Sequence, residues 1–115
     1  MKKYPKEKIY NKLVRDRIPE IIEQDGIIAE TKILSNDEFL SSLKKKILEE
    51  GKEFVEVVEE IEVKKEMADI LEILYSFAEE RGISLDEVES IRKERAEKRG
   101  RFKERIFLIG TKEKN

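Results

Sequence analysis

The stretch that decides the fold runs from Glu49 to Asp69 and contains two acidic motifs, Glu49-Glu50-Gly51-Lys52-Glu53 and Glu66-Met67-Ala68-Asp69. Each motif holds a pair of carboxylates three residues apart. On a helix, residues with this spacing lie on one face, so each pair can point at one shared object. The two motifs therefore predict two helices with acidic groups on defined faces.

Both acidic pairs border the apolar faces of their helices. At roughly 100° per residue, the apolar neighbours of Glu50 fall on either side of it: Leu43, Ile47, Phe54, Val57 and Val58. The same projection from Glu66 gathers Ile70, Ile73, Leu74 and Phe77 around it. A carboxylate in an apolar seam is costly unless it is paired or bound to a metal. The pattern therefore predicts a partner for these acids.

A helix break near Glu59 to Glu62 would fold the two segments into an antiparallel hairpin and bring the two pairs to similar heights. Four carboxylates at one height repel each other, so we infer a cation between them. Ligation by oxygen alone, without His or Cys, favours Mg²⁺ or Mn²⁺ over zinc. The predicted metal ligands are Glu50, Glu53, Glu66 and Asp69. The alternative is that these acids pair with surface lysines.

The order of the motifs resembles a known signature. Glu50-x-x-Glu53, followed after residues 54–65 by Glu66-x-x-Asp69, is similar to the metal-binding pattern of the MazG-like all-α nucleotide pyrophosphohydrolases. Two further stretches resemble its phosphoribosyl-ATP pyrophosphohydrolase-like branch: Tyr10-Asn11-Lys12-Leu13-Val14-Arg15-Asp16-Arg17-Ile18-Pro19-Glu20-Ile21-Ile22, and Arg99-Gly100-Arg101-Phe102 with Arg105-Ile106-Phe107-Leu108. Many members have a second Gly where this chain has Arg101. The resemblance covers most of the chain and specifies the branch better than the substrate.

The resemblance implies an enzyme that hydrolyses a standard or non-standard nucleoside triphosphate to the monophosphate and pyrophosphate, with Mg²⁺ or Mn²⁺ bound. Glu49 neighbours the metal pair and is the candidate to orient or deprotonate the attacking water. Its alternative is an exposed helical Glu, because helical geometry points it partly away from Glu50. Two other functions stay open: phosphoribosyl-ATP hydrolysis in histidine biosynthesis, and a non-catalytic helical interaction module.

Two groups of polar and cationic residues are candidates for substrate binding. The first is Asn11, Lys12 and Arg15, which spacing alone leaves open between solvated positions and a phosphate or base clamp; the resemblance favours the clamp. The second is Arg92, Arg95 and Arg99, which share one helix face. These arginines either pair with Glu89 and Glu94 or hold the triphosphate.

The amino-acid composition excludes several classes of protein. A chain of 115 residues is expected to form one domain, residues 1–115. It has no Cys and no His, which excludes disulfides, thiol chemistry and imidazole catalysis. A net charge of −2 argues against a general nucleic-acid binder. Without an apolar run of membrane length or a signal-peptide core, the expected location is the cytoplasm and no membrane partner is expected.

The predicted fold is all-α, a four-helix-bundle-like MazG-type subunit. Asp16 is the expected N-cap of a short helix that ends at Gly26, and Ser35 opens the next helix, predicted from Asp37 to Val58. The following helices are predicted from Val63 to Arg81 and, after the cap at Ser84, to Arg99. Short extended segments are expected over 27–34 and in the C-terminal tail.

The helix over 63–81 is apolar around more than half of its circumference, and Leu71, Tyr75 and Ala78 extend the stripe to a second side. A helix that is apolar on two sides needs two neighbours. With so few helices in the chain, we expect the second neighbour to be another copy of the chain. The predicted assembly is a homodimer or a dimer of dimers that binds a nucleotide substrate.

Overall fold

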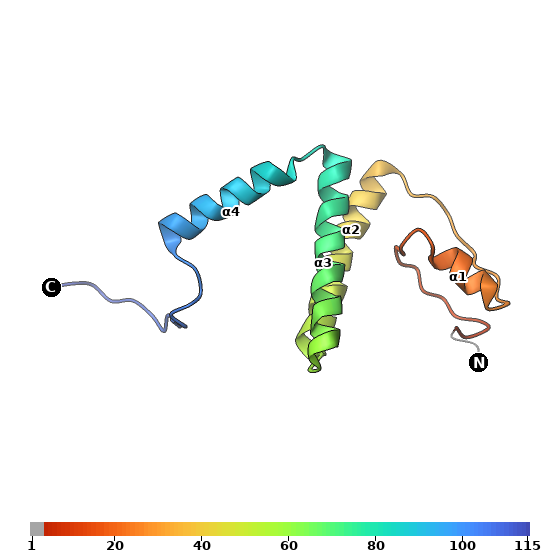
Figure 1. Ribbon diagram of the computed structural model, residues 1–115, viewed down its shortest axis with the longest axis horizontal. Helices are drawn as coiled ribbons and strands as arrows, with labels where there is room; N and C mark the ends of the chain where they lie inside the picture. Colours follow the sequence, from red (N-terminus) through yellow and green to blue (C-terminus); the bar gives the residue numbers. More distant parts are fainter. Residues whose placement is uncertain (1–3) are drawn as a thin grey trace. The chain divides into compact units, whose positions relative to one another are not determined.

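The computed structural model describes residues 4–115, which form four helices and no strand (Figure 1). The helices are α1 (Ile18–Gln24), α2 (Asn36–Glu56), α3 (Glu60–Arg81) and α4 (Leu85–Arg99). The predicted all-α class is confirmed. The chain divides into two compact units, Met1–Arg81 and Gly82–Asn115, and each is described by itself. Whether the whole chain acts as one domain stays a prediction.

The start of α1 differs from the prediction. Arg17, not Asp16, is the N-cap residue, and its side chain makes no capping hydrogen bond. The reason is a tight turn: the Ile18 amide donates to the Arg15 carbonyl at 3.0 Å, which places Asp16 inside the turn. Pro lies in the first turn of α1, as expected. At the other end Gly26 takes a φ of 78°, so the predicted stop is confirmed.

The start of α2 follows from a complete capping box. The Ser35 hydroxyl accepts from the Glu38 amide at 3.3 Å, and the Glu38 carboxylate accepts from the Ser35 amide at 3.1 Å. Two amides that the first turn would leave unpaired are thereby satisfied. The helix end predicted at Val58 comes earlier, because Val57 is already extended with ψ at 145°. The next helix accordingly starts at Glu60 instead of Val63.

Helices α2 and α3 run antiparallel and side by side, joined by the short turn over 57–59 (Figure 1). The most buried apolar residues in the described part of the chain are Leu43 on α2 and Ile73 and Ala78 on α3. Burial of Ala78 corrects the prediction that it belongs to an exposed second face. Leu71 and Tyr75 do remain about half exposed, at 47% and 50%.

The second unit consists of α4 and the segment that follows it. The Ser84 hydroxyl accepts from the Glu87 amide at 3.3 Å and caps α4 as predicted, and Gly100 ends it with a φ of 83°. α4 has no buried residue. The predicted extended segments, 27–34 in the first unit and the tail over 102–109 in the second, contain neither helix nor strand.

Candidate metal centre

Three of the four predicted metal ligands meet where α2 and α3 pack. Glu50 and Glu53 come from one face of α2, and Glu66 comes from α3. One carboxylate oxygen from each lies within 4.8 Å of the others. We call Glu50, Glu53 and Glu66 the glutamate cluster. The i,i+3 spacing on α2 and the antiparallel return of α3 produce the convergence that the sequence predicts.

Two oxygens of the glutamate cluster are buried and have no hydrogen-bond partner among the described residues: Oε2 of Glu50 and Oε2 of Glu66. A buried polar atom without a partner loses its hydration and gains nothing in return. Glu53, in contrast, is exposed. The cluster therefore combines two buried acceptors that lack a donor with one acceptor that is open to solvent.

Burial and mutual repulsion disfavour the charged forms of Glu50 and Glu53. Burial raises the pKa of Glu50, and interactions with Glu66 and the charge of Asp69 raise it further. Burial also raises the pKa of Glu53, with the charge of Glu50 as the next cause, while Glu66 and the charge of Lys12 oppose the rise. Glu50 and Glu53 therefore hold a proton more readily than an isolated glutamate does, and a bound cation would offset the same repulsion.

The donor set fits Mg²⁺ or Mn²⁺. Carboxylate oxygens are the ligands that these cations prefer, and the cluster contains no nitrogen or sulfur. Oxygens on opposite sides of Mg²⁺ lie about 4.2 Å apart, which is twice the usual metal–oxygen distance. The cluster oxygens all lie within 4.8 Å of one another, so small side-chain movements would bring them to one cation. A cation would also satisfy the two buried oxygens.

The fourth predicted ligand, Asp69, lies beside the glutamate cluster but outside the set of oxygens that converge. Its Oδ1 accepts from the Arg15 guanidinium at 2.7 Å. Asp69 lies close enough for its charge to act on Glu50. Its role as a ligand stays a prediction, and the structure adds a competing partner for it.

The segment before α1 carries the predicted substrate-binding residues Asn11, Lys12 and Arg15. Arg15 reaches Asp69, and the charge of Lys12 acts on Glu53. Lys12 also lies over the ring of Tyr10, with Nζ 5.9 Å from its centroid. Asn11 takes a left-handed φ of 45°, a conformation that Asn tolerates better than most residues, so its identity also has a backbone explanation. Two of the three candidates, Lys12 and Arg15, thus place positive charge near the acids.

Glu49, the predicted base, sits half exposed on α2. Its carboxylate forms an ion pair with Lys46 at 3.3 Å, one helical turn earlier. Glu49 is not part of the glutamate cluster. Glu49 is next to Glu50 in the sequence, and its role in water activation stays a prediction.

The arginines of α4 belong to the second unit. Arg92 pairs with Glu89, as the alternative interpretation expected, whereas Glu94 pairs with Lys98 at 2.9 Å and not with an arginine. Within residues 4–115, Arg95 and Arg99 form no ion pair. Phosphate binding by Arg92, Arg95 and Arg99 stays a prediction.

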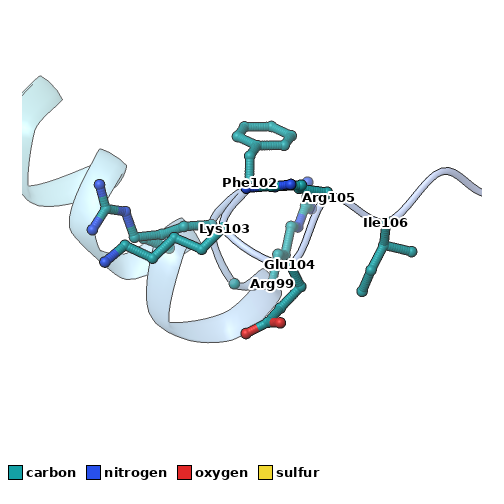
Figure 2. A pocket seen from close by; sticks show the side chains of 9 residues that line it. Arg99, Phe102, Lys103, Glu104, Arg105 and Ile106 are labelled. Atoms are coloured by element: carbon teal, nitrogen blue, oxygen red, sulfur yellow. The ribbon is translucent and has the colours of Figure 1, made fainter.

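An open pocket lies at the end of α4 (Figure 2). Its lining is rich in cationic side chains: Ala96, Arg99, Gly100, Arg101, Phe102, Lys103, Glu104, Arg105 and Ile106. The Phe102 ring and the Glu104 carboxylate point to opposite sides of the chain, and Ile106, further along the tail, points to the same side as Glu104. Arg105 takes a left-handed φ of 57° there. Arg99 is the one predicted substrate-binding residue in this lining.

A comparison with protein families identifies the class. A family model described as phosphoribosyl-ATP pyrophosphohydrolase matches residues 9–96. No curated protein and no solved structure matched the chain. The all-α fold and the family match define a member of the MazG-like superfamily. Within it, the chain belongs to the phosphoribosyl-ATP pyrophosphohydrolase family.

The family makes the chain a nucleotide pyrophosphohydrolase, a hydrolase of phosphoric anhydride bonds. The matched range includes the glutamate cluster, the segment before α1, and Arg92 and Arg95, but it ends before Arg99. None of the helices in the described part combines the length and apolar character that a membrane span requires.

Sequence reasoning missed two pairings at this site. Arg15 and Asp69 are 54 residues apart, and no local pattern connects them. Lys46 and Glu49 have i,i+3 spacing on one helix, so their pairing was visible in the sequence. The pairing of Arg15 with Asp69 depends on the path of residues 4–17. These residues contain no helix or strand, so no periodic pattern in the sequence predicts where Arg15 lies.

The raised pKa of Glu50 gives a prediction about stability without added cation. A carboxyl group whose folded pKa lies above its unfolded value of about 4.3 binds protons in the folded state first, so stability falls as pH rises through that window. Glu50→Gln should therefore raise the melting temperature at pH 7 by a few degrees and change it little at pH 4. Thermal melts in a chelator at both pH values test this.

The matched control is Glu79→Gln, which changes an exposed carboxylate of α3. It should leave the melting temperature nearly unchanged at both pH values. Equal effects of the two substitutions, or a Glu50→Gln protein less stable than wild type at pH 7, would contradict the assignment of repulsion to the glutamate cluster.

Proposed function

We propose that the protein hydrolyses a nucleoside triphosphate to the nucleoside monophosphate and pyrophosphate, with Mg²⁺ or Mn²⁺ held by the glutamate cluster. The observation that carries this proposal is the convergence of three carboxylates with two buried, unpartnered oxygens. In a member of this pyrophosphohydrolase family, a cation is the partner that such oxygens lack.

Glu50, Glu53 and Glu66 would hold the cation, with Asp69 as the predicted fourth ligand. When bound, the cation would supply positive charge that offsets the negative charge developing on the phosphate groups. The rest of the chemistry falls to side chains. Water adds to phosphorus, the anhydride bond breaks, pyrophosphate leaves, and one proton is released. Glu49 is the proposed group that orients this water or accepts its proton, since the chain contains no histidine.

Cationic side chains would position the triphosphate. Lys12 and Arg15 lie on the segment whose charges act on the glutamate cluster and on Asp69. An arginine can hold phosphate through two parallel hydrogen bonds, and a lysine acts as a point charge. Arg95 and Arg99 are proposed for the same task, and their lack of ion pairs within the described residues leaves their guanidinium groups available.

The second candidate substrate is phosphoribosyl-ATP, which would give the protein a role in histidine biosynthesis. The description of the matching family favours it. The chemistry at the glutamate cluster would be the same, and the base pocket would differ.

A single screen tests the reaction and separates the two substrates. Pyrophosphate release is measured with Mg²⁺ or Mn²⁺ over standard nucleotides, modified nucleotides and phosphoribosyl-ATP. Glu50→Gln and Asp69→Asn should each abolish turnover while circular dichroism shows unchanged helix content, and Glu79→Gln should stay active. Wild-type turnover that survives exhaustive chelation of divalent ions would overturn the metal-dependent mechanism.

We also propose that the protein works as a twofold homodimer through an apolar stripe on α3. The stripe consists of Met67, Leu71, Leu74 and Tyr75, which are 45–52% exposed in the single chain. Their spacing places them along one side of the helix. A contiguous apolar surface of this kind is typical of an interface. Twofold symmetry would let the stripe of one copy cover that of the other, and two such dimers can form a tetramer.

Light scattering tests the dimer. Charges placed in the stripe by Leu71→Lys with Tyr75→Glu should convert the dimer to a monomer, because removing both charges from water costs more than their mutual attraction returns and the apolar contacts are lost. Leu48→Lys is the control: Leu48 is also exposed, but it lies on α2. A wild-type protein that is monomeric at micromolar concentration with full activity would show that the stripe has another role.

A further inference from the structure

The ion pair between Arg15 and Asp69 sits at the border of the glutamate cluster. The guanidinium donates to Oδ1 of Asp69 at 2.7 Å, a short, charge-assisted hydrogen bond. Asp69 lies one helical turn after Glu66 on α3, and its charge reaches Glu50. Arg15 therefore neutralises the one acid at this site that is outside the converging set of oxygens.

Arg15 and a metal cation compete for the same carboxylate. An oxygen of Asp69 that accepts from Arg15 gives up part of its charge to that bond. A fixed positive charge beside the glutamate cluster also repels an incoming cation. Both effects lower the affinity of the site for metal as long as Arg15 stays on Asp69.

The ion pair between Arg15 and Asp69 lies where either side chain can take another partner. Its two side chains are 57% and 38% exposed, so water can replace either partner at low cost. Residues 4–15 contain no helix or strand, so moving the side chain breaks no regular structure. Lys12 on the same segment adds a second positive charge near Glu53. One short segment thus supplies cations to two of the four acids.

We propose that Arg15 is a positioning residue that exchanges partners: it holds Asp69 until a divalent cation takes that carboxylate, and it then binds a phosphate group of the substrate. This inference rests on the proposed function of the glutamate cluster. Arg15 keeps Asp69 neutralised before the cation arrives and becomes available to an anion once the cation is in place. Cation and triphosphate binding are then coupled through one side chain, and each raises the affinity for the other.

The exchange predicts effects of opposite sign for one substitution. Arg15→Gln removes the competitor for Asp69, so Mn²⁺ should bind about fivefold more tightly in the absence of any phosphate compound, equivalent to about 1 kcal/mol. The same substitution removes a phosphate ligand, so inorganic triphosphate should bind the Mn²⁺-saturated protein about tenfold more weakly. A residue with only a structural role would not strengthen one affinity and weaken the other.

The experiment measures Mn²⁺ binding by electron paramagnetic resonance of the free ion, and binding of inorganic triphosphate by calorimetry. The matched control is Arg17→Gln, because Arg17 is the next arginine along the chain and pairs only locally, with Glu20 at 3.4 Å. It should match wild type in both measurements. Arg15→Lys should restore the weaker, wild-type affinity for Mn²⁺.

The outcomes separate the exchange from the proposed function. Failure of the wild-type protein to bind Mn²⁺ would overturn both. Wild-type binding with an unchanged Mn²⁺ affinity in Arg15→Gln, or an unchanged triphosphate affinity, would overturn the exchange alone. If Arg15→Gln does not fold, nitrogen-15 spectra of wild type decide: added Mg²⁺ should shift the Arg15 guanidinium signal and leave that of Arg17 in place. A stationary Arg15 signal would overturn the proposal.

Discussion

The α2–α3 hairpin holds three carboxylates close together against their mutual repulsion, and the rest of the site depends on this constraint. Helix packing buries Leu43 and Ile73, and the same packing fixes Glu50 and Glu66 at the seam with a buried oxygen each. Apolar burial of the helix faces stabilises an arrangement that electrostatics alone would separate. A protein that keeps such an arrangement gains a site where a cation replaces several unfavourable contacts at once.

Cationic side chains near the hairpin partly offset the repulsion between its carboxylates. Arg15 and Lys12 supply positive charge to the acids from residues 4–17, which contain no helix or strand. Capping defines the ends of the framework: the Ser35 cap fixes where α2 starts, and the i,i+3 spacing places Glu50 and Glu53 on one face of that helix. The acids thus lie on packed helices, whereas Lys12 and Arg15 lie outside any helix.

Local rules account for what the sequence could predict. Ser35, Ser84, Gly26 and Gly100 mark helix ends by mechanisms that act within a few residues, and the structure agrees at each. The convergence of the glutamate cluster was predictable because i,i+3 spacing and an antiparallel hairpin suffice to produce it. The start of α1 was wrong, since a turn at Arg15 displaced Asp16, and Ala78 was placed on the wrong side of α3. The Arg15–Asp69 pair joins segments 54 residues apart, and no local rule reaches that far.

We propose that Glu50, Glu53 and Glu66 form one cation site at the seam of the hairpin. Anomalous diffraction from crystals grown with Mn²⁺, recorded at the manganese absorption edge, would locate the cation. An anomalous peak is expected within bonding distance, about 2 Å, of oxygens from α2 and α3 glutamates of the cluster. Manganese found only elsewhere on the surface, with the three carboxylates free of metal, would contradict it.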